Sequence, residues 1–308
     1  MRISTANAFS TSVDQLQRRQ QDLVQAQEKL TSGKRVLKPS DDPAAAARAE
    51  RAMAAIDRSV ASQRALDASR NAMQLSESAL GQAGELIQQA RELVINAGNG
   101  SLSDTERLTL GEALRGLRSD LLTVANRSDG AGRYLFGGQG SDGPPLLDTA
   151  TGVSYVGTTG TQMAAAGEST PLTIDGNAAW LSTTDPSDPS ARLSVFAALD
   201  KVINVLVTPG QTPAQVGQAV STGLGDLDAT SATLSSWRSR AGEALNRMDG
   251  IQTRLAQTKL DAQTARSDAE DLDLLQAISD FQSQQTGYEA ALKVYASVQR
   301  LSLFDYIR

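Results

Sequence analysis

The chain of 308 residues contains no cysteine and no histidine. The first absence excludes a disulfide framework, a thiolate nucleophile and a cysteine metal site. The second removes the commonest general base and metal ligand. No apolar run reaches the roughly 18 residues that a membrane-spanning helix needs, and the start, MRISTANAFSTSVDQ, lacks the apolar stretch of a secretory signal. Composition alone therefore predicts a soluble, cytoplasmic protein without membrane insertion.

Aromatic residues are also scarce, at 4% of the chain, which argues against a thick globular core. The apolar residues are mostly Ala, Leu and Val, a composition typical of long helices packed closely through small side chains. Five of the twelve aromatic residues nevertheless lie in the last 28 positions: Phe281, Tyr288, Tyr295, Phe304 and Tyr306. A C-terminus is normally frayed and polar, so this concentration indicates a contact surface.

The formal net charge is −6, and no run of Lys and Arg is dense enough for a nucleic-acid patch. The charge is uneven along the chain. Residues 1–39 carry seven basic and three acidic side chains, whereas residues 271–308 carry three basic and five acidic ones. This opposite bias favours pairing of the two ends, although exposed charges contribute little energy.

A heptad pattern opens the chain and predicts a helix of roughly 27 residues. Its apolar positions lie seven apart, and the intervening positions include two glutamines. The pattern consists of Phe9, Leu16, Leu23 and Leu30, interleaved with Val13, Gln20 and Gln27. Glutamine weakens the stripe, which suits a surface that awaits partners better than a finished core.

The segment LTSGKRVLKPSDDPAAAARAE (30–50) interrupts this helix and starts another. Gly33 and Pro39 are helix breakers. Asp41 or Asp42 is expected to cap the next helix, because Pro43 fits a first helical turn. An aspartate pair can also bind a metal, but no further ligands lie nearby in the sequence, so capping is the preferred interpretation.

Long helices are predicted on both sides of a central insert. From Ala44 to Ala97, large residues (Leu66, Met73, Leu80, Ile87, Val94) and small ones each repeat every seven positions. A turn with a Ser103–Glu106 capping box follows, and a second long helix begins near Pro213. Between the two long helices, three short apolar runs predict strands: RYLF (133–136), VSYV (153–156) and PLTI (171–174). A further apolar run predicts a short helix at 194–206.

The last helix mirrors the first, with Leu274, Phe281, Tyr288 and Tyr295 seven apart and Ile278, Gln285 and Leu292 between them. The predicted fold is mainly α: a long antiparallel helical rod or coiled-coil bundle built from both termini, with a small β-rich inserted domain. Three domains are expected: a terminal coiled-coil domain (1–41 plus 272–308), a long-helix rod (42–132 plus 191–271) and the insert (133–190).

No catalytic pattern is evident. The sequence GQGSDG (138–143) matches G-x-G-x-x-G, but Pro144 and Pro145 follow it, so no helix can start there to bind a pyrophosphate. It is interpreted as a turn-forming loop. The sequence therefore predicts no enzyme, no cofactor and no metal site.

Two states of the tails are compatible with these patterns. Short isolated helices are marginally stable, so both tails are expected to be mobile in the monomer and to become ordered against neighbouring molecules. The alternative is that the two tails pair with each other as an ordinary coiled coil.

Four stretches resemble the flagellin superfamily, and within it the hook-associated protein 3 branch. They are MRIST at the start, LTSGKRVLKPSDDPAAAARAE (30–50), ANRSDGAGRYLFGG (125–138) and VQRLSLFDYI (298–307). The second stretch is shared with flagellin. The sequence GRYLFGG, together with the aromatic residues of VQRLSLFDYI, favours the hook-associated protein 3 branch. Residues 139–190 match no motif of the family.

The resemblance implies a structural subunit of the bacterial flagellum, in an annular homo-oligomeric layer between the first hook-associated protein and the flagellin filament. It implies export through the flagellar type III apparatus without a cleaved signal, hence an extracellular location, and an export chaperone as a further partner. The terminal domain is then the innermost layer and the insert the outer one. The expected assembly interface consists of Phe9, Val13, Leu16, Leu23, Leu30, Ile278, Phe281, Tyr288, Leu292, Tyr295, Leu301, Leu303, Phe304, Tyr306 and Ile307.

Two other classes remain as alternatives. A flagellin, or another secreted filament protein, would polymerise by itself into long filaments. A soluble coiled-coil adaptor or an enzyme is the third, and the enzyme lacks the residue types for catalysis.

Overall fold

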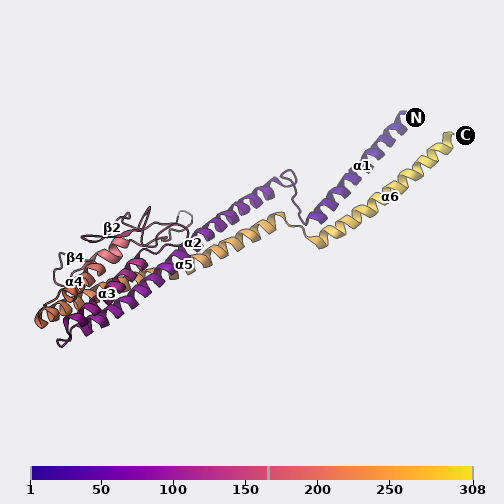
Figure 1. The fold of residues 1–308 in the computed structure, drawn as a ribbon. Coiled ribbons are helices and arrows are strands. Elements are labelled where there is room, and N and C mark those ends of the chain that lie inside the picture. The colour runs from indigo at the N-terminus through magenta and orange to yellow at the C-terminus, as the bar shows by residue number, and fades with distance from the viewer. Residues whose placement is uncertain (1, 165–166, 307–308) are drawn as a thin grey trace. The chain divides into compact units, whose positions relative to one another are not determined.

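The computed structural model describes residues 2–164 and 167–306. The chain is mainly helical, as predicted, and its elements are shown in Figure 1. The helices are α1 (Arg2–Ser32), α2 (Pro43–Ala97), α3 (Asp104–Ala125), α4 (Val195–Val207), α5 (Pro213–Glu270) and α6 (Leu274–Tyr306). The chain forms two compact units, residues 58–256 and residues 1–57 with 257–308.

Helix ends follow the caps and breakers of the sequence. Helix α1 ends before Gly33, whose φ of +69° suits glycine. Helix α2 begins at Pro43, and the Asp42 carboxylate accepts the Ala45 N–H at 2.9 Å, so the predicted cap is confirmed. The capping box of Ser103 and Glu106 at the start of α3 is also confirmed.

Within residues 58–256, α2 and α5 run antiparallel. Three ion pairs join the two helices in reversed order along the chain: Arg70–Asp249 (2.9 Å), Glu77–Arg238 (2.6 Å) and Arg91–Asp228 (3.0 Å). The large heptad residues of α2 are buried, and so are the small residues three positions after them. Small side chains on this face let neighbouring segments approach closely. One such segment is the insert, where the Thr170 hydroxyl donates to the Ser69 hydroxyl at 2.8 Å.

The insert contains two short antiparallel ribbons. Strand β1 (Leu146–Thr149) pairs with β2 (Gly152–Tyr155), and β3 (Thr183–Thr184) pairs with β4 (Arg192–Leu193). The strand predicted at VSYV is confirmed by β2. The strands predicted at RYLF and PLTI are wrong, since both segments are irregular; the residues that directly follow them, Gly137 and Asp175, form an isolated bridge.

The apolar residues of RYLF and PLTI pack into a core instead of forming strands. Leu135 and Phe136 are fully buried, and Phe136 meets the Trp180 ring edge-on, with ring centroids 5.2 Å apart. Trp180 lies in a π-helical turn, η1 (Asn177–Leu181), and stacks on Phe196 of α4 at 6.3 Å. The apolar side chains of RYLF and PLTI therefore contribute to a core, although neither segment forms a strand.

Candidate assembly surface

The pair formed by α1 and α6 contains the predicted assembly residues other than Ile307. The two helices lie side by side and run antiparallel (Figure 1). Half-buried side chains of the pair include Leu16 and Leu23 on α1 and Phe281, Tyr288 and Tyr295 on α6; Val13 and Leu30 are half-buried as well. The pairing matches the alternative in which the tails associate with each other, while mobility of the tails in solution stays a prediction.

The second row of the α6 heptad is exposed rather than buried. Ile278 is 46% exposed and Leu292 is 41% exposed. Positions four residues apart from the contact row lie about 40° further around a helix. The seam predicted on α6 therefore divides into one row that faces α1 and one row that faces solvent.

By helix geometry, some of the exposed apolar residues of the two helices lie on one side of the pair, whereas Val294 of α6, which is 62% exposed, does not. On α1, Val24 is 49% exposed, and its helical position places it beside the contact row, as Ile278 and Leu292 are on α6. In an antiparallel pair of right-handed helices, positions that follow the contact row in the same rotational sense fall on the same side. We call Val24, Ile278 and Leu292 the apolar face.

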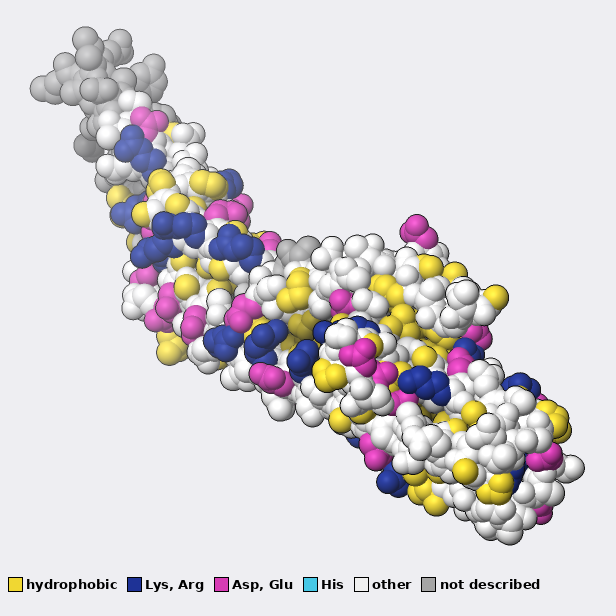
Figure 2. Space-filling view, turned by 90° about the vertical axis from the view of Figure 1, so that its left-hand side faces the viewer, with side chains coloured by type: hydrophobic (Ala, Val, Ile, Leu, Met, Phe, Trp, Pro, Cys, Tyr) yellow, Lys and Arg dark blue, Asp and Glu magenta, His cyan; other side chains and the backbone are white. Residues whose placement is uncertain are grey.

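A shallow groove of about 500 Å³ continues this face at the C-terminal end of α1. It brings the loop residue Leu37, which is 36% exposed, near Val24. Its lining residues are Val24, Gln27, Glu28, Thr31, Ser32 and Leu37. Figure 2 shows one face of the molecule, on which hydrophobic side chains are mixed with charged side chains of both signs.

Several predicted interface residues have side chains outside the described part of the structure. The backbones of Phe9, Leu301, Leu303, Phe304 and Tyr306 are helical, but their side chains are not described. Ile307 lies outside the described residues altogether.

The loops that precede α2 and α6 pair with each other. The Arg35 N–H donates to the Glu270 carbonyl at 2.7 Å, and the Leu272 N–H donates to the Gly33 carbonyl at 3.0 Å. Lys34 and Asp271 are therefore opposite each other in an antiparallel bridge. From the sequence these segments are recognisable only as breaks between helices, because nothing local indicates which distant backbone they contact.

Two aspartates organise the first of these loops. The Asp41 carboxylate accepts the N–H groups of Lys38 (2.9 Å) and Leu37 (3.0 Å), which lowers the pKa of Asp41. The Ala45 N–H, and then the Arg35 guanidinium, lower the pKa of Asp42. Both carboxylates therefore stay charged at neutral pH and hold the loop against the start of α2.

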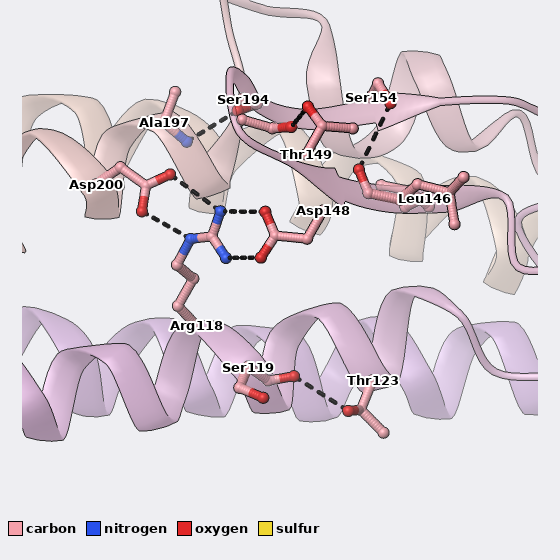
Figure 3. Close-up of polar contacts among 12 residues, drawn as sticks. Arg118, Ser119, Thr123, Leu146, Asp148, Thr149, Ser154, Ser194, Ala197 and Asp200 are labelled. Carbon is pink, nitrogen blue, oxygen red and sulfur yellow. Dashed lines mark hydrogen bonds and ion pairs between the residues drawn. The ribbon is translucent and has the colours of Figure 1, made fainter.

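In the other unit, Arg118 of α3 anchors the insert (Figure 3). It donates two hydrogen bonds to Asp148 of β1, at 2.7 and 2.9 Å, and its Nε lies 2.7 Å from Asp200 of α4. These hydrogen bonds, with Asp148 first, raise the pKa of Arg118 further above its ordinary value, and they lower the pKa of Asp148. Arg118 also lies over the Phe196 ring, 5.8 Å from its centroid. One side chain thus joins α3, α4 and the insert.

Within residues 2–164 and 167–306, no group of three or more His, Cys, Asp or Glu is placed to hold a metal ion. Over the same residues, no helix is both long and apolar enough to cross a membrane. The GQGSDG segment forms a turn in which Gly138 has a φ of +64°.

Sequence comparisons match nearly the whole chain. The model of the bacterial flagellin N-terminal helical region matches residues 3–141, and that of the C-terminal helical region matches residues 224–307. Flagellar hook-associated protein 3 of Escherichia coli (strain K12) is 30% identical over 319 residues, covering 99% of each chain. The protein of the same name from Salmonella typhimurium is 29% identical over 318 residues, covering 100% of each chain.

Solved structures share the fold at lower sequence identity. A putative flagellar hook-associated protein from Vibrio parahaemolyticus has a TM-score of 0.64 at 20% identity, covering 75% of this chain and 100% of that one. Xanthomonas campestris FlgL has a TM-score of 0.61 at 20% identity, covering 71% and 99%. The flagellar junction protein FlgL from Legionella pneumophila has a TM-score of 0.56 at 18% identity, covering 63% and 97%.

Proposed function

Because the chain belongs to the flagellin superfamily and, within it, to the hook-associated protein 3 family, we propose that it is the structural subunit that joins the flagellar hook to the filament. The family consists of structural components of the flagellum. The junction role is supported by the Legionella pneumophila relative, whose structure is described as a flagellar junction protein, and by full-length similarity to two hook-associated proteins.

The observation that carries the proposal in this chain is the apolar face of the α1–α6 pair. Ile278 and Leu292 are large, exposed and on the same side as Val24. Large apolar side chains exposed along one side of a helix pair are typical of an interaction surface. A neighbouring copy, the first hook-associated protein or flagellin covers this face in the assembled junction, with residues 1–41 and 272–308 innermost, 42–132 and 191–271 around them, and the insert outermost.

The proposal includes the route by which the subunit reaches this place. The chain is exported through the flagellar type III apparatus, with a chaperone covering the C-terminal helix before export. The exposed apolar residues of α6 support this part, since such a face needs protection from aggregation until it is covered.

A double substitution, Ile278→Ser with Leu292→Ser, tests the surface. Both side chains are exposed, so the isolated chain is expected to keep its helicity and stability within about 1 kcal/mol. A strain that carries only this variant should form hooks, lose filaments and release flagellin into the medium. The matched control is Ala290→Ser, at an exposed position on another side of α6, which should support normal filaments.

Normal filaments with the double variant would overturn the assigned surface. The junction role itself is tested separately by deleting the gene, which should leave hooks without filaments. If the purified chain instead polymerised by itself into long filaments, as seen by sedimentation and electron microscopy, the alternative of a flagellin would hold.

A further inference from the structure

The loops that meet beside the terminal helices have a role beyond connecting them. We infer that residues 33–36 and 269–272, here called the joint, set the register of α1 against α6. The role in setting the register does not depend on the proposed function. Its effect on assembly rests on the proposed function, because the register decides which apolar residues of the two helices lie together on the face offered to neighbours.

Heptad packing alone leaves the register open. Leu16, Leu23 and Leu30 repeat every seven residues on α1, and Phe281, Tyr288 and Tyr295 do so on α6. A slip of seven residues therefore places side chains of the same kind opposite each other. Such repeats need an additional feature to specify alignment.

The joint supplies this feature through backbone hydrogen bonds. Two backbone hydrogen bonds flank Lys34 and Asp271 and pair them. The Arg35 N–H donates to the Glu270 carbonyl, and the Leu272 N–H donates to the Gly33 carbonyl. Arg19 lies fifteen residues before Lys34, and Gly287 lies sixteen residues after Asp271. These two positions meet, since a Cβ at Gly287 would lie 2.9 Å from Arg19 Nη1. The helices thus keep the alignment that begins at the joint.

Arg35 is the positioning residue of the joint. Its guanidinium donates to Asp42, which caps α2, at 3.1 Å and to the Ala269 carbonyl in the last turn of α5 at 2.8 Å. It therefore ties the start of one long helix to the end of the other. Beside it, Glu270 accepts from Arg266 at 2.7 Å and lies 3.3 Å from the Lys34 ammonium group.

The test measures the register directly in the isolated full-length chain. Because the chain has no cysteine, spin labels on Gln20→Cys and Gln285→Cys would be the only two, and their separation reports the alignment of α1 and α6. One narrow distance distribution is expected. The variant Arg35→Ala with Leu272→Pro removes the guanidinium contacts and the Leu272 N–H, and should broaden or shift that distribution.

The matched control is Arg18→Ala with Leu275→Ala, which changes the same residue types at exposed positions outside the joint. Its distribution should equal that of the parent chain. An unchanged distribution in the joint variant, or a broad one already in the parent chain, would overturn the inference. If the joint variant shifts the register while cells still build normal filaments, the inference holds and the assembly surface of the proposed function is wrong.

Discussion

Arg118 on α3 donates two parallel hydrogen bonds to Asp148 on β1, and the same guanidinium donates a hydrogen bond to Asp200 on α4. The arginine side chain is 14% exposed, whereas those of its two partners are 45% and 34% exposed. These three residues therefore combine a largely buried cation with two carboxylates that keep part of their hydration. Their hydrogen bonds join the insert to helices α3 and α4.

Arg118→Ala should destabilise residues 58–256 by about 2 kcal/mol, less than the loss of a fully buried pair because the two carboxylates remain partly hydrated. Urea unfolding followed by circular dichroism measures the change. The control is Arg115→Ala, which loses only an exposed pair with Glu112 one turn away and should cost about 0.5 kcal/mol or less. Equal unfolding midpoints for the two variants would show that Arg118 does not anchor the insert.

Gly138→Ala should destabilise the insert by roughly 2–4 kcal/mol. Gly138 has a φ of +64°, and a Cβ there would lie 1.9 Å from the Thr158 carbonyl oxygen. Gly140 is two residues away in the same loop, and a Cβ there meets nothing within 4 Å, so Gly140→Ala serves as the control. Thermal unfolding should separate the two variants clearly, and similar melting temperatures would contradict the close backbone approach.

Alkaline pH should destabilise the protein through Tyr155. Burial, and then the charge of Asp175, raise the pKa of the Tyr155 hydroxyl to about 12. Above pH 10 the unfolded chain loses this proton while the folded chain keeps it, so stability falls as pH rises from about 10 towards 12. Comparing melting temperatures at pH 8 and pH 11 should show a smaller drop for Tyr155→Phe than for the parent chain. An equal drop in melting temperature for the variant and the parent chain would show that Tyr155 does not contribute to the pH dependence.

A cysteine pair should form a disulfide across the joint. Lys34 and Asp271 occupy a non-hydrogen-bonded antiparallel pair, in which Cα atoms are about 4.5 Å apart, within the range of disulfides. Lys34→Cys with Asp271→Cys should therefore oxidise within the monomer, as a mobility shift under non-reducing conditions would show. Lys38→Cys with Asp271→Cys places the first thiol elsewhere in the same loop and should oxidise far more slowly. Comparable rates would mean that the two loops are not held in this pairing.

Local chemistry determined the helices of this protein from its sequence. Breakers and capping residues such as Gly33, Asp42 and Ser103 act within a few residues, so the ends of α1 and the starts of α2 and α3 could be located without a structure. Heptad spacing likewise identified the apolar stripes, because side chains seven residues apart lie on one side of a helix whatever surrounds it. The concentration of aromatic residues near the end of the chain likewise predicts an assembly surface.

Contacts between distant segments were decided only by the tertiary structure. RYLF and PLTI have the composition of strands, yet their side chains pack into a core that includes Trp180, and the adjoining residues form isolated bridges. Nothing near Arg118 in the sequence indicates Asp148 or Asp200 as its partners, and nothing near Lys34 indicates Asp271. The separation of the α6 seam into a buried row and an exposed row had the same cause: a helix carries its stripe by itself, but only the position of α1 determines which part of that stripe is covered.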